Sequence, residues 1–158
     1  MNKHISYKLD QLFVEDVAVS DITSNLRTPF YVYSRTSIKD NFDRFTRSLK
    51  GLDSIICYSV KANSNLGILR VFKDLGAGFD IVSGGELSRV LAVGGDPKDV
   101  IFSGVGKSTA EIDLALKVGV GCFNIESHSE LIRIQQRAVL AEKIAPISIR
   151  FNPDVDAK

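Results

Sequence analysis

Hydrophobic residues follow two alternating periods along most of this chain. A helical spacing is marked by Ile38, Phe42, Phe45 and Leu49. A short apolar run over residues 54–61 comes next. Recurrence every three to four residues predicts an amphipathic helix, whereas a short apolar run between glycine and polar residues predicts a buried strand. The alternation repeats, with further strands expected over residues 78–83, 99–103, 121–126 and 146–151.

Helix signals fill the gaps between these strands. Gly76 and the pair Gly94 and Gly95 are expected to end two of the helices, and S-x-x-E patterns at residues 108–111 and 127–130 predict capping boxes at the start of two others. Five strand–helix units of this kind predict a parallel α/β sheet.

The chain before residue 36 has a different pattern. Short strands are expected over residues 7–9, 12–14 and 29–33, without a regular helix between them. We therefore expect residues 1–35 to be the N-terminal segment of a separate β domain and residues 36–158 to form the α/β part.

Two folds accommodate five parallel strands. A flavodoxin-like sheet would be complete in 158 residues, whereas a (β/α)8 TIM barrel takes about 250 residues and would be only five-eighths present. Length alone favours the complete sheet.

Polar residues stand towards the C-terminal ends of the five predicted strands. They are Lys61, Asp80, Ser103, Asn124 and Arg150. Barrel enzymes place their chemistry at this end, where polar side chains point into the mouth. In an open sheet, helices would cover the same positions, and each polar side chain would need its own partner.

Lys61 is the strongest single candidate for a catalytic residue. At the end of an apolar strand its ammonium group is desolvated, which favours a neutral, nucleophilic amine suited to Schiff-base chemistry. A salt bridge with Asp80 or Glu86 accounts for the same placement. The spacing of the residues does not distinguish a nucleophilic lysine from a salt-bridged one.

A glycine-rich segment after the third strand resembles a phosphate-binding loop only in part. Gly106, Lys107 and Ser108 fit the end of that pattern, but its first glycine would have to stand at Ile101, inside a strand. We therefore expect an ordinary loop with Ser108 as the helix N-cap.

Composition narrows the classes of function. Hydrophobic residues make up 44% and charged residues 25%, and 20 basic residues balance 19 acidic ones. These values exclude a disordered chain and disfavour a nucleic-acid partner, and no apolar run is long enough for a membrane span. Cys57 and Cys122 are isolated and expected to be small buried residues, so we expect no metal site and a cytoplasmic location.

Several colinear segments resemble diaminopimelate decarboxylases, within the wider alanine-racemase-like, pyridoxal-phosphate-dependent decarboxylases. They are TPFYVY (28–33), YSVKANSN (58–65), GAGFDIVSGGEL (76–87), IFSGVGK (101–107), GCFNIES (121–127) and RFNPDVDAK (150–158). The resemblance implies a TIM barrel with a β domain built from both chain ends, which overrides the length argument.

The resemblance also implies a cofactor and a reaction. Lys61 would carry pyridoxal 5'-phosphate, and Asp80 and Arg150 would lie at the cofactor. Glu86 would have a supporting role. Ser103 and Asn124 are also expected to support the site, because they stand near the C-terminal ends of their strands. The implied reaction converts meso-2,6-diaminopimelate to L-lysine and carbon dioxide, in a homodimer when full length.

The family's phosphate-binding, substrate-binding and proton-donor motifs do not occur in these 158 residues. We therefore expect the N-terminal portion of such an enzyme, inactive alone. The alternatives are a decarboxylase of the same fold acting on ornithine or arginine, and a non-catalytic five-stranded binding module.

Overall fold

The computed structural model describes residues 4–24, 26–151, 153 and 155. The chain divides into two compact units, Met1–Ser54 and Ile55–Lys158, and each is described by itself. The expected boundary between residues 35 and 36 stays a prediction, because it refers to the domains of a longer protein.

The first unit begins with a small antiparallel sheet. Strands β1 (Ile5–Lys8), β2 (Gln11–Val14) and β3 (Val17–Ala18) pair in this order and lead into helix α1 (Val19–Thr23). Two of the predicted strands are thus confirmed. The strand predicted over residues 29–33 is wrong, since this segment pairs with no strand among the described residues. Pro29 lacks an N–H donor, and Tyr31 is 91% exposed.

Helix α2 (Arg35–Ser48) completes the first unit and confirms the helix predicted there. Its N-cap is Ser34, whose hydroxyl oxygen accepts a hydrogen bond from the Ser37 amide. The Glu15 carboxylate, in the turn between β2 and β3, accepts bonds from the Ser34 hydroxyl (2.6 Å) and the Thr36 amide (2.8 Å). These bonds lower the pKa of Glu15 and tie the small sheet to the start of the helix.

The second unit is built on one parallel sheet. Its strands are β4 (Cys57–Ser59), β5 (Gly78–Ile81), β6 (Val100–Phe102), β7 (Cys122–Ile125) and β8 (Ile147–Ile149), and they lie side by side in chain order. Each strand therefore pairs with the next one along the chain. Cys57 lies opposite Gly78, and Phe79 lies opposite Val100.

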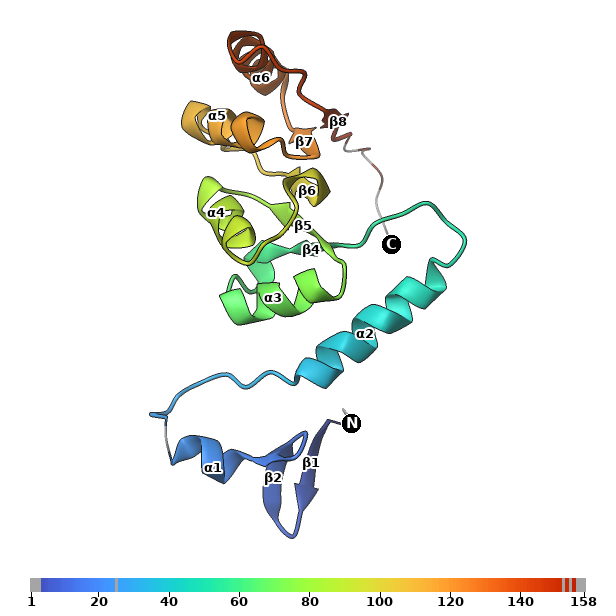
Figure 1. The fold of residues 1–158 in the computed structure, drawn as a ribbon, viewed down its shortest axis with the longest axis vertical. Helices are drawn as coiled ribbons and strands as arrows, with labels where there is room; N and C mark the ends of the chain where they lie inside the picture. Colours follow the sequence, from blue (N-terminus) through green and yellow to red (C-terminus); the bar gives the residue numbers. More distant parts are fainter. Residues whose placement is uncertain (1–3, 25, 152, 154, 156–158) are drawn as a thin grey trace. The chain divides into compact units, whose positions relative to one another are not determined.

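Four helices follow the strands and lie along one face of this sheet (Figure 1). They are α3 (Leu66–Asp74), α4 (Gly84–Ala92), α5 (Thr109–Val118) and α6 (His128–Leu140), with short 3-10 turns η1 (Val60–Ala62) and η2 (Pro97–Asp99). Phe79, Phe102 and Phe123 point from the sheet to the helices and are buried. None of the helices in the described residues is long and apolar enough to cross a membrane.

Strand order decides between the two folds that the sequence left open. A doubly wound sheet reverses its strand order at a switch point and carries helices on both faces. Here the order runs β4 to β8 without reversal, and the helices lie along one face. This is the winding of a barrel wall.

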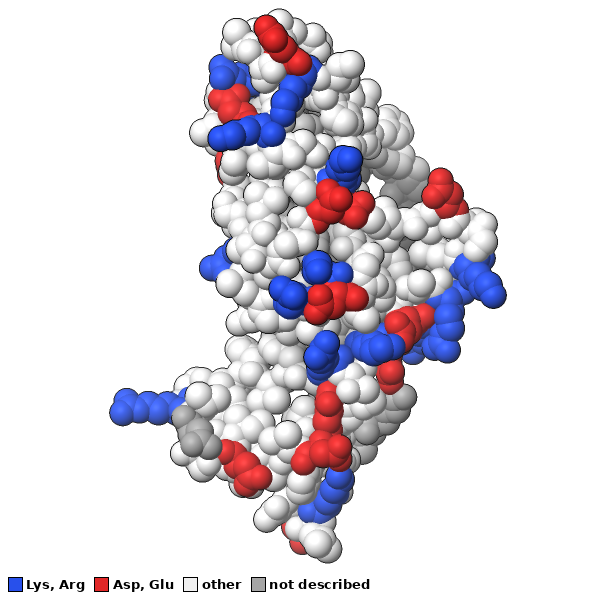
Figure 2. Space-filling model, viewed as in Figure 1, with Lys and Arg blue, Asp and Glu red and all other residues white. Residues whose placement is uncertain are grey.

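Charged side chains of both signs are interspersed on the face seen in Figure 2. Some of the pairs join neighbouring helices. Arg137 on α6 donates two hydrogen bonds to the Asp113 carboxylate on α5, at 2.6 and 2.7 Å. This two-point geometry fixes the relative rotation of the two helices.

Glu111 joins the starts of two helices. It completes the predicted capping box with Ser108, whose amide lies 2.9 Å from its carboxylate. The same carboxylate accepts a hydrogen bond from the amide of Gly84, the first residue of α4, at 2.7 Å. These bonds, that of Gly84 first, lower the pKa of Glu111.

We expect Glu111→Gln to lower the free energy of unfolding of the full-length protein by about 1 kcal/mol at pH 7. Because folding lowers the pKa of Glu111, its contribution is present above the unfolded pKa of about 4.3 and is lost as pH falls through the folded value. Urea unfolding at pH 7 and pH 3 should therefore show a difference that shrinks in acid. Glu142→Gln, on an exposed side chain, is the control; an equal loss for both variants would contradict the capping role.

Candidate functional site

The face of the sheet opposite the helices carries polar side chains near the C-terminal ends of the strands. Ser59 ends β4 and lies opposite Asp80 on β5. Ser103 directly follows β6, and Asn124 lies on β7. All four are half-buried, whereas the alternate positions, such as Phe79 and Phe102, are buried under the helices.

These side chains form one continuous row of hydrogen bonds across the strands. The Asn124 amide nitrogen donates to the Ser103 hydroxyl oxygen at 3.0 Å, and the Ser103 hydroxyl donates to Asp80 Oδ1 through a short bond. Ser59 donates to the other oxygen of Asp80 at 3.4 Å. The donors point towards Asp80 from both sides and hold its carboxyl group at a fixed place. Three of the predicted site residues are thereby brought together, and Ser59 is a member that the sequence argument missed.

Lys61 lies two residues after Ser59, just past this row of hydrogen-bonded side chains. Its position differs from the expected one. The strand predicted over residues 54–61 is shorter: β4 ends at Ser59, and Lys61 belongs to η1. Its side chain is exposed, so the expected burial at a strand end is wrong. The 3-10 turn carries the side chain past the last ladder hydrogen bond. In the described part of the chain it forms no ion pair with Asp80 or Glu86, so its amine is accessible.

Glu86 and Arg150 lie outside the row of hydrogen bonds. The Glu86 carboxylate accepts a hydrogen bond from the Val82 amide at 2.7 Å and so closes the start of α4. Arg150 is 63% exposed, and its Nη1 lies 3.4 Å from Glu126 Oε1. Glu126 was not predicted as a site residue, although it follows β7 as Ser103 follows β6.

Lys107 is a second lysine at this end of the sheet, and its ammonium group is engaged in an ion pair. Its ammonium is buried and donates to Glu130 at 3.1 Å, so the sequence was right to exclude a phosphate-binding loop. The capping box predicted over residues 127–130 forms only in part. Ser127 accepts from the Glu130 amide as expected, but the Glu130 carboxylate accepts from Glu126 rather than from Ser127. Lys107 draws it inward, which a local pattern does not reveal.

Carboxylates lie at the starts of α4, α5 and α6, whereas α3 begins at the N-cap Asn65, whose amide oxygen accepts a hydrogen bond from the Gly67 amide. Glu111 occupies the starts of α4 and α5, and Glu130 occupies the start of α6. Helix N-termini are the usual places for phosphate groups, and a carboxylate there repels them. The described residues therefore fit the reactive end of a phosphorylated aldehyde, with an accessible amine at Lys61 and the carboxyl group of Asp80 held in place, and the starts of α4, α5 and α6 disfavour its phosphate.

Both cysteines are free and lie on the polar face rather than in the core expected for them. Burial, and then the Asp80 and Asp99 carboxylates, raise the pKa of Cys57. Burial alone raises the pKa of Cys122. Both thiols therefore stay protonated at neutral pH and are poor nucleophiles.

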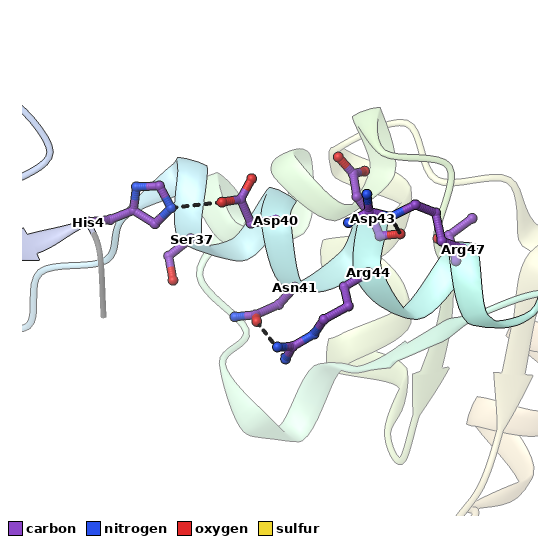
Figure 3. A pocket seen from close by; sticks show the side chains of 8 residues that line it. His4, Ser37, Asp40, Asn41, Asp43, Arg44 and Arg47 are labelled. Carbon is purple, nitrogen blue, oxygen red and sulfur yellow. Dashed lines mark hydrogen bonds and ion pairs between the residues drawn. The ribbon is translucent and has the colours of Figure 1, made fainter. Parts of the chain in front are cut away.

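A separate pocket of about 900 Å³ lies in the first unit. Figure 3 shows that its lining comes from α2 and from His4, whose Nε2 lies 2.9 Å from Asp40 Oδ2. Arg44 and Asn41 pair with each other in the same wall. These polar groups bind one another, and none of them was predicted as a site residue.

Comparison with known proteins gives consistent matches. The family model described as "Pyridoxal-dependent decarboxylase, pyridoxal binding domain" matches residues 35–158. Diaminopimelate decarboxylase of Pseudomonas aeruginosa is 54% identical over 153 residues, which are 97% of this chain and 37% of that protein.

Two solved diaminopimelate decarboxylases, both described as complexes with L-lysine, have the same fold. The structure from Helicobacter pylori has a TM-score of 0.85 and 44% identity, with 89% of this chain and 36% of that one covered. The structure from M. jannaschii has a TM-score of 0.91 and 33% identity, with 98% and 37% covered. The chain thus spans little more than a third of these relatives. The segment that resembles the family at residues 150–158 lies partly outside the described residues.

Proposed function

This chain belongs to the pyridoxal-dependent decarboxylases and comprises their pyridoxal-binding domain in part, and from this premise we propose that the full-length protein decarboxylates meso-2,6-diaminopimelate to L-lysine. The observation that carries the proposal is the accessible amine of Lys61. It follows the strand whose last residue, Ser59, binds Asp80, at the C-terminal end of a barrel sheet. The identity of 54% to a diaminopimelate decarboxylase supports the choice of substrate.

The residues of this chain have distinct tasks in the proposed reaction. Lys61 would hold pyridoxal phosphate through its Nζ atom. When bound, the cofactor accepts the electron pair that remains on the substrate carbon after carbon dioxide leaves. Asp80, which Ser59 and Ser103 hold in place, would help to hold and orient the cofactor. The accessible amine of Lys61 would also be suited to move protons at the site.

Arg150 and Glu126 would form the opposite side of the mouth. Their contact of 3.4 Å leaves the exposed guanidinium able to turn towards an anionic group. The family resemblance implies that another part of the full-length protein donates the proton to the product carbon, and neither Cys57 nor Cys122 is assigned this role.

We further propose that the full-length protein is a cytoplasmic homodimer. Two free cysteines suit a reducing compartment. The family resemblance supports a dimer, in which a second copy supplies groups to each site.

The test is a purified full-length protein incubated with pyridoxal phosphate and meso-2,6-diaminopimelate. We expect carbon dioxide and L-lysine in equal amounts. A panel with ornithine and arginine distinguishes the related decarboxylases. Faster turnover of either amino acid would overturn the assignment of substrate, and no turnover of any of the three would overturn the proposed reaction.

Borohydride reduction of the same preparation tests the cofactor lysine. We expect peptide mapping to find the reduced cofactor on Lys61 and not on Lys107, because all three N–H donors of Lys107 are engaged by oxygen atoms. Modification of any other lysine, with Lys61 unmodified, would contradict the assignment.

A further inference from the structure

The ammonium group of Lys107 is buried between three segments of the site end of the sheet. Its Nζ donates to the carbonyl oxygens of Gly104 and Asn124, both at 2.8 Å, and to Glu130 Oε1 at 3.1 Å. The Lys107 side chain is 0% exposed and that of Glu130 is 5% exposed. Every donor of the ammonium therefore has an acceptor.

The second oxygen of Glu130 extends this contact to the end of β7. It accepts a hydrogen bond from the Glu126 amide at 2.8 Å. Glu126 in turn accepts from the Gly104 amide at 3.3 Å. Gly104 has a φ of +97° and is thus held from both sides, at its carbonyl by Lys107 and at its amide by Glu126.

The segments that this ion pair joins carry Ser103 and Asn124, two of the hydrogen-bonded side chains of the site. Gly104 follows Ser103, whose hydroxyl donates to Asp80. Asn124 receives the ammonium on its backbone carbonyl, while its side chain donates to Ser103. A movement of either segment would therefore change the contacts of Asp80.

Stability alone does not account for a buried ion pair here. Desolvation of two charges offsets most of their attraction, and well-packed apolar side chains of similar volume are often equally stable or more so. What an apolar pair lacks is the set of directed hydrogen bonds that places Gly104, Asn124 and Glu126.

We propose that Lys107 and Glu130 are positioning residues of the decarboxylase site, which set Ser103, Asn124 and Glu126 in the geometry that holds Asp80. This inference rests on the proposed function. Neither residue touches the reacting atoms, and both act through the residues that they bind.

The test compares variants of the full-length protein. Lys107→Met and Glu130→Leu each leave one buried charge unpaired, so both should unfold at lower temperature. The double variant removes both charges and should unfold within a few degrees of the unchanged protein. In the double variant we expect kcat to fall about tenfold with KM little changed, because substrate contacts remain while the geometry of the site is relaxed.

A second measurement does not depend on turnover. In the cofactor-free full-length protein, the amides of Gly104 and Glu126 should exchange hydrogen about tenfold faster in the double variant. The matched control is Asp113→Leu with Arg137→Met, which removes the half-exposed ion pair between α5 and α6. This control should leave kcat and both amides unchanged.

A stable double variant with unchanged kcat and unchanged exchange would overturn the inference and leave the ion pair a structural element. If the double variant does not fold, Glu130→Gln decides. It retains the shape and an acceptor for Lys107, but its NH2 group faces the Glu126 amide. Faster exchange at Glu126 with a lower kcat supports positioning, and no change in either overturns it. If the unchanged protein fails to decarboxylate, the proposed function fails, while the exchange comparison still tests the positioning.

Discussion

Replacement of Lys61 by methionine in the full-length protein is expected to lower kcat for diaminopimelate about a thousandfold, because it removes the amine that we propose to hold the cofactor and to move protons at the site. The variant should still fold. The Lys61 side chain is exposed and follows β4 in a short turn, and exposed substitutions of this kind usually change stability by less than about 0.5 kcal/mol.

Steady-state kinetics and thermal unfolding of the same preparations check this expectation. Lys98→Met is the matched control, because Lys98 is also exposed but lies in η2, at the opposite end of the strands. It should retain full activity. A Lys61→Met protein with a kcat near that of the control would show that another group holds the cofactor.

A large loss of stability is expected from Gly121→Ala. A Cβ atom at Gly121 would lie 1.9 Å from the carbonyl oxygen of Lys98 and 2.8 Å from its carbon. The backbone of η2 would have to move, and the bond from the Gly121 amide to the Pro97 oxygen (3.0 Å) would be strained. We expect a loss of about 3 kcal/mol in the free energy of unfolding.

Gly106→Ala is the control for this substitution. A Cβ there meets no atom within 4 Å, and the lower entropy of the unfolded chain should make the change neutral or slightly stabilising. Urea unfolding of the two full-length variants gives the comparison. Equal stability of the two variants would mean that η2 moves aside at little cost.

The order of strands and helices in the second unit was predictable because each unit carries its own local signals. The apolar run before Gly84 and the Ser108 to Glu111 pattern mark a strand and a helix start without help from the rest of the chain. The expectation of a partial TIM barrel, which the family resemblance supplied, is confirmed by the parallel sheet and by the relatives.

The predictions that failed depend on partners that a local pattern does not contain. Glu130 has the spacing of a capping residue, yet Lys107, which precedes it by 23 positions, draws its carboxylate away. Residues 29–33 have the composition of a strand, but a strand also needs a neighbour. Lys61 continues an apolar run, and the 3-10 turn that exposes it has no distinct signal in the sequence.

For the candidate site, the alternation of polar and apolar positions was sufficient to bring Asp80, Ser103 and Asn124 onto one face. It did not predict the direction of their hydrogen bonds or the participation of Ser59. Those depend on the register between strands, in which Ser59 lies opposite Asp80. The functional roles assigned to all six site residues stay predictions: Lys61, Asp80, Glu86, Ser103, Asn124 and Arg150.

The uninterrupted strand order also has a consequence for how the chain folds. Cys57 pairs with Gly78, Phe79 with Val100, and Ile101 with Cys122, each pair 21 positions apart. The last strand pairs Phe123 with Ile147, 24 positions apart, so every new strand closes a loop of similar, modest length onto the strand made just before it. Such short-range pairing favours rapid formation and suits a sheet that grows by one unit at a time during synthesis.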